Sequence, residues 1–325
     1  MSVASEQILT RRYQCGPVAI ELAAEAVWIE RLSSELLMFD VPFEGPGISL
    51  RIEVRMDMPP VPVVQGRYLH CNRYLADRHG EEYVMTAQTG AWCRFDAASG
   101  CARAFAPDYS DDAVEDVEQF LIFALVLGWR ATGWVHMHAA SLVRQGQCAL
   151  VCAESHGGKS TFTAACIRRG FQTLGDDKVL IRPGVPARAY GLSRSMNLDP
   201  AVSRWFPEAA DIASIPPYSR WTPKRKVQIE SLWPGATHRA AMPTILLKLR
   251  RVTQGPPLAL EPLPAEDVLQ TLARQTVIPS DRAAAALMLP AILQLSTQMR
   301  GWVMTVSPEA YNDPEYLRVL DGLFA

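Results

Sequence analysis

Apolar and polar residues alternate along residues 48–56, which read Ile-Ser-Leu-Arg-Ile-Glu-Val-Arg-Met. A period of two is typical of a strand that has one buried face. Shorter runs of the same kind follow at 68–75 and 82–86, after a proline-rich break at 59–62. This pattern predicts a β-rich N-terminal domain over residues 1–107.

A different pattern begins near residue 111, where acidic residues precede a long apolar run. Asp111 and Asp112 open the segment, and residues 120–129 are almost wholly apolar. Acidic side chains favour the first turn of a helix, because they face its positive end. The run is far shorter than the roughly 20 residues that cross a bilayer, so we predict a buried core helix and no membrane span. We place this helix at the start of a second domain, residues 111–325.

The second domain mixes helical and strand patterns. An apolar strand leads to a helix over residues 159–169, which Gly170 ends as a C-cap. A short strand at 171–174 and an apolar strand at 244–249 follow. From about residue 262 the apolar positions recur at helical spacing. We therefore predict an α/β domain with a helical C-terminal tail.

Composition narrows the classes of protein. The chain has 325 residues, 49% of them apolar and 20% charged, which describes a globular protein with room for about two domains. A net charge of −2 gives no electrostatic case for nucleic acid. The pair Arg11-Arg12 resembles an export signal, but Glu21 and Glu25 interrupt the apolar stretch that such a signal needs. Seven cysteines without paired spacing suit a reducing compartment, so we expect a cytoplasmic protein.

The segment Ala149-Leu-Val-Cys-Ala-Glu-Ser-His-Gly-Gly-Lys-Ser-Thr-Phe-Thr163 has the form of a phosphate-binding loop between a strand and a helix. Ala153 replaces the first glycine of that motif, so its entry turn must be one that an L-residue tolerates. The helix N-terminus and the loop amides favour an anion, the lysine reaches the outer phosphates, and the serine hydroxyl can ligate Mg²⁺. We predict that the nucleotide contacts Ser155, His156, Gly157, Gly158, Lys159, Ser160 and Thr161.

Two adjacent carboxylates, Asp176 and Asp177, follow the helix in Leu174-Gly-Asp-Asp-Lys178. Neighbouring side chains in an extended segment point in different directions. One carboxylate can therefore hold Mg²⁺, while the other accepts a proton from an attacking hydroxyl. The alternative is a solvated turn without a function.

A compact basic segment, Arg220-Trp-Thr-Pro-Lys224-Arg-Lys226, lies further along the chain. It can stabilise charge on a transferring phosphate, meet an acidic peptide, or simply be a solvated loop. Lys226 is our preferred phosphate or substrate contact, with Arg225 beside it, because an alternating strand-like run starts there.

Four features taken together resemble the kinase domain of HPr kinase/phosphorylase. They are the strand that begins at His136 and includes His138, the GKS-type loop, the helix that ends in glycine, and the Asp-Asp pair. They resemble more closely the HPr-kinase-related proteins of peptide-modification pathways, which include the lasso-peptide serine kinases. The resemblance covers roughly residues 115–250. It implies an α/β P-loop kinase domain, and an N-terminal domain that recognises a substrate or partner.

The resemblance also implies roles for residues of this chain. Asp176 is expected to be the catalytic base, with His138 beside it to fix its orientation or charge. Asp177 and Ser160 are expected to serve the metal, and Lys159 to hold the phosphates. Thr161 stands where the HPr-acting enzymes carry glutamate, and their downstream glycine-and-asparagine loop has no clear counterpart. Both departures favour a dedicated kinase over one that acts on HPr and reverses the reaction.

The sequence therefore predicts an ATP- and Mg²⁺-dependent phosphotransferase that acts on a serine or threonine hydroxyl of a peptide or protein. A ribosomally made precursor peptide, as in lasso-peptide tailoring, is the acceptor that the resemblance suggests. Two alternatives stay open, a nucleotide-binding regulatory protein without transfer activity and a small-molecule kinase on the same scaffold. Related proteins can assemble, so a homo-oligomer is a further possibility.

Overall fold

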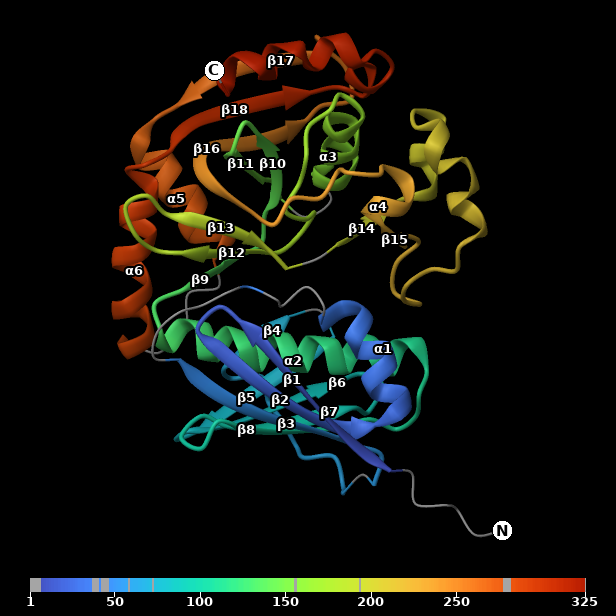
Figure 1. Cartoon of the computed structure of the whole chain (residues 1–325), viewed down its shortest axis with the longest axis vertical. Coiled ribbons are helices and arrows are strands. Elements are labelled where there is room, and N and C mark those ends of the chain that lie inside the picture. The colour runs from blue at the N-terminus through green and yellow to red at the C-terminus, as the bar shows by residue number, and fades with distance from the viewer. Residues whose placement is uncertain are drawn as a thin grey trace. The chain divides into compact units, whose positions relative to one another are not determined.

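The chain forms two compact units in its computed structural model, Met1–Thr132 and Gly133–Ala325, and each is a mixture of helices and strands (Figure 1). No helix among the described residues is long and apolar enough to cross a membrane. The structure describes residues 7–36, 41, 47–57, 59–71, 73–154, 157–192, 194–276 and 282–324.

The first unit is built on one eight-stranded sheet, in the order β1-β2-β3-β8-β7-β6-β5-β4. The predicted alternating strand is β3, Ile48–Arg55, and its apolar residues Leu50 and Ile52 are each only 1% exposed. The β-rich character of this region is confirmed. The other strands are β1 Ile8–Cys15, β2 Val18–Glu25, β4 Leu69–Cys71, β5 Tyr74–His79, β6 Glu82–Ala87, β7 Trp92–Asp96 and β8 Cys101–Phe105.

The predicted core helix is α2, Asp111–Ala131, and it belongs to the first unit. Ser110 caps it by accepting a hydrogen bond from the Ala113 amide, and two acidic residues occupy the first turn as expected. Its apolar stripe packs on β2, β3, β7 and β8, beside helix α1 (Ala26–Leu36). The boundary between units therefore lies after Thr132, and the predicted boundary near 107–111 is corrected, because the helix buries its apolar face on the sheet that precedes it.

The second unit is built on another eight-stranded sheet, in the order β10-β11-β16-β13-β12-β9, with β18 beside β16 and β17 beside β18. Strands β11 (Gln147–Cys152) and β16 (Ala240–Arg251) run parallel and confirm the apolar strands expected there. The remaining strands of the unit are β9 Val135–Met137, β10 Ala140–Arg144, β12 Val179–Arg182, β13 Arg188–Gly191, β17 Leu258–Leu263, β18 Arg300–Val306 and the separate pair β14 Ser195–Leu198 and β15 Arg225–Gln228.

The C-terminal region is not purely helical, which corrects the predicted helical tail. Helices α5 and α6 are present, but β17 and β18 flank them, and β18 pairs in parallel with β16 (Figure 1). The short apolar β18 gains its backbone partners only from strands distant in sequence. The helical elements of the unit are α3 Lys159–Arg168, α4 Ile229–Leu232, α5 Ala265–Gln275, α6 Arg282–Ser296, and the 3₁₀ helices η2 Pro200–Arg204, η3 Pro207–Ser214, η4 Pro308–Tyr311 and η5 Pro314–Leu323.

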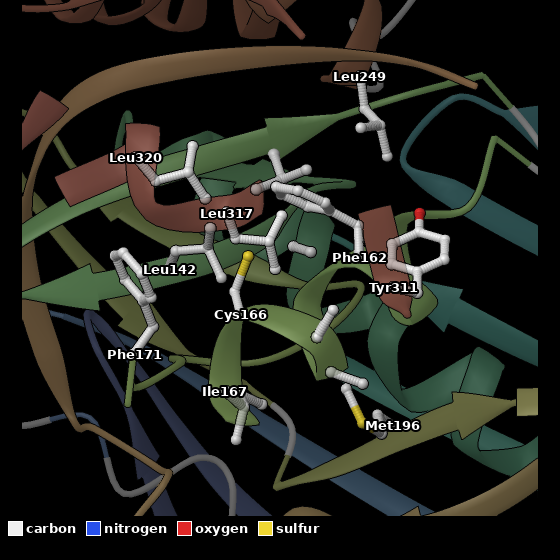
Figure 2. Packing of buried hydrophobic residues seen from close by; sticks show 14 of the residues in the cluster. Leu142, Phe162, Cys166, Ile167, Phe171, Met196, Leu249, Tyr311, Leu317 and Leu320 are labelled. Carbon is white, nitrogen blue, oxygen red and sulfur yellow. The ribbon is translucent and has the colours of Figure 1, made fainter. Parts of the chain in front are cut away.

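Both faces of the second sheet are covered. Along β11, Ala149 and Val151 join the apolar cluster under α3 and η5, whereas Leu150 joins the cluster under α5 and α6. A strand buried on both faces reads as a continuous apolar run, which is why this segment stands out in the sequence. Figure 2 shows the α3 side, where Phe162 and Cys166 of the helix pack with Leu142 and Leu317.

The backbone of β13 passes very close to the segment that precedes β12, at Gly191. A Cβ atom added to Gly191 would lie 1.9 Å from the carbonyl oxygen of Leu174. Real Cβ atoms never approach an oxygen so closely, so any larger residue at this position must push Leu174 and its neighbours away.

We predict that Gly191→Ala lowers the free energy of unfolding by at least about 1–3 kcal/mol, the usual cost of overpacking. Urea denaturation followed by circular dichroism measures this change. Gly322→Ala is the matched control, because a Cβ at Gly322 meets no atom within 4 Å. Equal stability of the two variants would contradict the close contact.

Candidate functional site

The predicted phosphate loop joins the end of β11 to the start of α3. Gln145 is the described non-glycine residue with a positive φ, so Ala153 keeps an ordinary backbone, as the missing glycine requires. Gly158 has a φ of +87° and stands immediately before the helix. A Cβ at Gly157 would lie 2.8 Å from both the Ala153 Cβ and the Glu154 carbonyl oxygen, so only glycine fits there. The loop thus needs both glycines for its path.

Helix α3 presents its N-terminus to this loop. Its N-cap residue, Gly158, has no side chain that could cap the helix, and the first backbone bond runs from the Phe162 amide to the Gly158 carbonyl. The amides of the first turn are therefore donors without an intrahelical acceptor, which is the feature that binds phosphate. Ser160 and Thr161 lie half-buried in this turn, whereas Ser155 and His156 of the predicted nucleotide set fall outside the described residues.

A buried hydroxyl network places the Asp-Asp segment beside the strand pair that carries the loop. Ser141 of β10 accepts hydrogen bonds from the amides of Leu174 (2.8 Å) and Gly175 (3.2 Å). Thr173 donates its hydroxyl to the Ser141 carbonyl at 2.8 Å. The expected strand at 171–174 forms only isolated bridges, at Gln172 and Thr173. Side-chain hydrogen bonds and a few backbone bonds, rather than a regular strand, therefore fix the position of the two carboxylates.

The two carboxylates differ in burial. Asp176 is only 3% exposed, and its Oδ2 accepts a hydrogen bond of 3.4 Å from the Asn197 amide. The Ser160 hydroxyl is near enough to this carboxylate to lower its pKa. Its Oδ1 is buried and has no hydrogen-bond partner among the described residues. A buried acceptor without a partner is costly, so this oxygen is suited to a cation or another donor.

The electrostatic surroundings of Asp176 raise its pKa when no cation is present. Burial is the largest cause, and the nearby charge of Asp177 adds to it, raising the pKa of Asp176 to about 6. The Ser160 hydroxyl, the Asn197 amide and the charge of Lys224 oppose this rise in pKa. A bound cation would act in the same direction as these three groups and would favour the ionised carboxylate.

His138 connects the second carboxylate to the lysine of the loop. It follows β9 directly, and its Nε2 lies 2.9 Å from the Lys159 Nζ, while its Nδ1 lies 3.1 Å from the Asp177 Oδ1. Because an ammonium can only donate, Nε2 is the acceptor, and the ring proton sits on Nδ1 and is donated to Asp177. The side chains of His138 and Asp177 are 49% and 39% exposed, so this pair faces solvent.

The charge on Asp177 is stabilised by its partners. Burial raises the pKa of Asp177, but the hydrogen bond and charge of His138, followed by the charges of Lys178 and Lys159, outweigh it and leave the pKa well below its usual value. The two aspartates do point in different directions, as expected from the extended backbone. Their partners, however, are exchanged relative to the sequence prediction, because His138 pairs with Asp177 and Ser160 pairs with Asp176.

The basic segment lies near the buried carboxylate. Lys226 of β15 is opposite Asn197 in the β14–β15 ladder, and the Asn197 amide is bonded to Asp176. The guanidinium of Arg225 donates to the Pro223 carbonyl. Lys224 is the member of the segment whose charge acts on Asp176, and no pattern in the sequence singles this residue out.

Arg251, the last residue of β16, is a further candidate that sequence reasoning missed. Its Cδ lies 3.6 Å from the position that a Cβ on Gly158 would occupy, and the Tyr311 hydroxyl lies 4.0 Å from the same position. Burial raises the pKa of Tyr311, and the charge of Arg251 opposes that rise. In the part of the chain that the structure describes, the Arg251 side chain makes no hydrogen bond or ion pair. The signal in the sequence was only its place at the end of the strand parallel to β11.

The donors present suit Mg²⁺. Hydroxyl and carboxylate oxygens are the ligands that this hard cation prefers, and it usually takes one or two from the protein and the rest from phosphate and water. Ser160 and Asp176 supply such a pair, and the Oδ1 of Asp176 has no hydrogen-bond partner among the described residues. The described residues contain no cluster of three or more metal-ligating side chains, so no all-protein cage for a metal is found among them.

Comparisons with known proteins give little further information. No protein-family model matches the chain, and no curated protein matches its sequence. Among solved structures, the chain is similar to the Hpr(Ser) kinase/phosphatase from Coxiella burnetii, with 11% sequence identity and a TM-score of 0.32 over 58% of this chain and 96% of the other. A likeness at this TM-score carries no argument, so any function rests on the geometry of the site itself.

Proposed function

We propose that this protein transfers the γ-phosphoryl group of ATP to a serine or threonine hydroxyl of a polypeptide, in a reaction that requires Mg²⁺. The observation that supports this most strongly is the line from Lys159 through His138 to Asp177. It connects Lys159, the first residue of α3, to a carboxylate that is 39% exposed. A phosphate donor and a hydroxyl acceptor need these two groups on either side of the transferred phosphorus.

The nucleotide phosphates are held by the N-terminus of α3 together with Lys159 and Arg251. The Lys159 ammonium has three N–H donors. One of them is hydrogen-bonded to His138, so two can bind phosphate oxygens. Arg251 adds a planar guanidinium that can bind a phosphate through two hydrogen bonds. These cations also stabilise the charge on the phosphoryl group as it moves.

Ser160 and Asp176 are the residues that would hold Mg²⁺. The bound cation neutralises charge on the phosphates. Asp176 is only 3% exposed, whereas the side chain of Asp177 is 39% exposed, so a polypeptide hydroxyl reaches Asp177 more readily. We therefore propose that Asp176 is a metal ligand, and not the catalytic base that the resemblance implied.

Asp177 is then the group that receives the acceptor hydroxyl. The hydroxyl oxygen forms a bond to the γ-phosphorus, the bond from that phosphorus to ADP breaks, and the hydroxyl proton passes to Asp177. His138 keeps the carboxylate ionised and correctly oriented through its Nδ1 proton. The low basicity of Asp177 is compatible with this role, because a loose phosphoryl-transfer transition state depends mainly on positioning.

The acceptor that we expect from the resemblance is a ribosomally made precursor peptide. A regulatory protein that binds nucleotide without transfer would leave no phosphate on any acceptor. A small-molecule kinase would place it on a metabolite. Incubation with γ-labelled ATP and an extract of the source cell, followed by mass spectrometry of the labelled product, separates these three outcomes.

We predict that Asp177→Asn lowers kcat for phosphate transfer at least about 100-fold, the usual range for losing a general base, and changes the Kd for ATP less than about threefold. The amide keeps the shape of the side chain but accepts no proton. Rates are measured with γ-labelled ATP, and Kd by calorimetry. Asp211→Asn, at an exposed position of η3, is the control. Full transfer by Asp177→Asn would remove the assigned base.

A second prediction concerns the stability of the metal-free protein. Since folding raises the pKa of Asp176 from 3.8 to about 6, the folded state loses stability as the pH rises through this interval. Asp176→Asn removes the effect, so the variant should be more stable than the parent by about 1–3 kcal/mol at pH 7.5 and equal to it near pH 4. Denaturation in the presence of chelator at several pH values measures the difference. A variant that is less stable at pH 7.5 would contradict the buried, partnerless carboxylate.

The third prediction tests the residue at the end of β16. Arg251→Ala should raise the Kd for ATP about tenfold, because a charge-assisted hydrogen bond contributes about 1.5–3 kcal/mol. The Kd for AMP should change less than the Kd for ATP, since AMP lacks the outer phosphates. Arg188→Ala, at an exposed position of β13, is the matched control. If both variants bind ATP like the parent, Arg251 is not a phosphate ligand.

A further inference from the structure

The segment that connects η3 to β15 concentrates positive charge. Residues 212–229 contain four basic residues and no acidic residue, although the whole chain has a net charge of −2. We call residues 215–226 the basic loop. Its cations are Arg220, Lys224, Arg225 and Lys226.

The basic loop has a defined conformation. The Tyr218 amide donates to the Lys224 carbonyl at 3.3 Å, and Ser219 forms a backbone bridge with Thr222. The Ser219 hydroxyl accepts a hydrogen bond from the Trp221 amide at 3.3 Å. These contacts close the loop into a turn whose tip is Arg220 and Trp221.

The end of the loop is fixed beside the proposed site. Lys226 and Asn197 are directly opposed in the antiparallel β14–β15 pair, so their side chains project from the same face. The Asn197 backbone amide donates a hydrogen bond to Asp176. The end of the basic loop is therefore held beside the carboxylate that we assign to the metal.

The tip of the loop combines an apolar surface with a cation. Trp221 is 50% exposed, and the guanidinium carbon of Arg220 lies 4.5 Å from the centre of its ring. An aromatic ring on the surface with an arginine stacked on it resembles the anchor residues of protein interfaces, where tryptophan and arginine are enriched. Free phosphate has no apolar group that could pack on such a ring, whereas a polypeptide has apolar side chains as well as carboxylates.

We infer that the basic loop is the docking surface for the acceptor, and that this acceptor is an acidic polypeptide segment. Carboxylates that flank the acceptor hydroxyl contact Arg220 and Lys224, and an apolar side chain of the segment packs on Trp221. The positive charge of the basic loop favours an acidic segment over a neutral or basic one. The inference rests on the proposed function and adds the chemical class of the substrate to it.

Three labelled peptides of equal length test the inference. Each carries one central serine, flanked by glutamates, by glutamines or by lysines. Fluorescence anisotropy gives the Kd of each peptide for the full chain with ADP and Mg²⁺ present, and γ-labelled ATP gives the KM values. The glutamate peptide should bind at least tenfold more tightly than the glutamine peptide, and the lysine peptide more weakly than either.

Two variants locate the contact. Arg220→Glu and Trp221→Ala should each weaken the glutamate peptide at least tenfold, and Arg220→Glu should improve the lysine peptide, while the KM for ATP stays unchanged. Both positions are exposed, so the fold should be retained, and a thermal melt checks this. Arg188→Glu, on β13, makes the same charge change and should leave all three peptides unaffected.

The possible results distinguish this inference from the proposed function. Equal binding of the glutamate and glutamine peptides overturns the inference even if both are phosphorylated. If Arg220→Glu raises the KM for ATP and leaves peptide binding unchanged, the inference is also overturned, and the loop is a nucleotide site. Arg220-dependent binding of the glutamate peptide without any phosphate transfer supports the docking surface and removes the kinase assignment.

Discussion

One buried side chain, the hydroxyl of Ser141, ties the segment that carries the two carboxylates to the strand pair that carries the phosphate loop. It accepts the amides of Leu174 and Gly175 while its own strand pairs with β11, which leads into the phosphate loop. The segment that carries the carboxylates forms only isolated bridges, so these hydrogen bonds act together with the backbone bonds of Gln172, Thr173 and Gly175 to place the carboxylates beside the loop. The two backbone amides need an acceptor here, because a buried amide without a hydrogen-bond partner destabilises the fold.

From this constraint follows the division between the two aspartates. The segment is extended, so consecutive side chains leave it on opposite sides. One enters the protein and meets Ser160, and the other leaves it and meets His138. Burial raises the pKa of the inner carboxyl, and a cationic neighbourhood lowers that of the outer one. Two identical residues thereby acquire the different properties that a metal ligand and a proton acceptor require.

The sequence was most informative where the signal is local. The acidic first turn of α2, the strict alternation of β3 and the strand–loop–helix order around Lys159 each depend on neighbouring residues, and each appears in the structure. Distant contacts were not predictable. Strand β18 is defined by pairing with β16, whose partner residues lie 55 positions earlier, and α2 could be assigned to a unit only from the sheet that buries it. The same holds for the partners of His138, because nothing in a sequence states which of two adjacent carboxylates turns outward.

The central claim is that the buried carboxylate serves the metal and the exposed one the acceptor. Crystals grown with Mn²⁺ and a non-hydrolysable ATP analogue test it directly, since anomalous scattering locates the ion without ambiguity. The account predicts an ion bound to the Ser160 hydroxyl and the Asp176 carboxylate, with Asp177 still hydrogen-bonded to His138. An ion bound to Asp177 instead, with Asp176 facing the γ-phosphate, would contradict it.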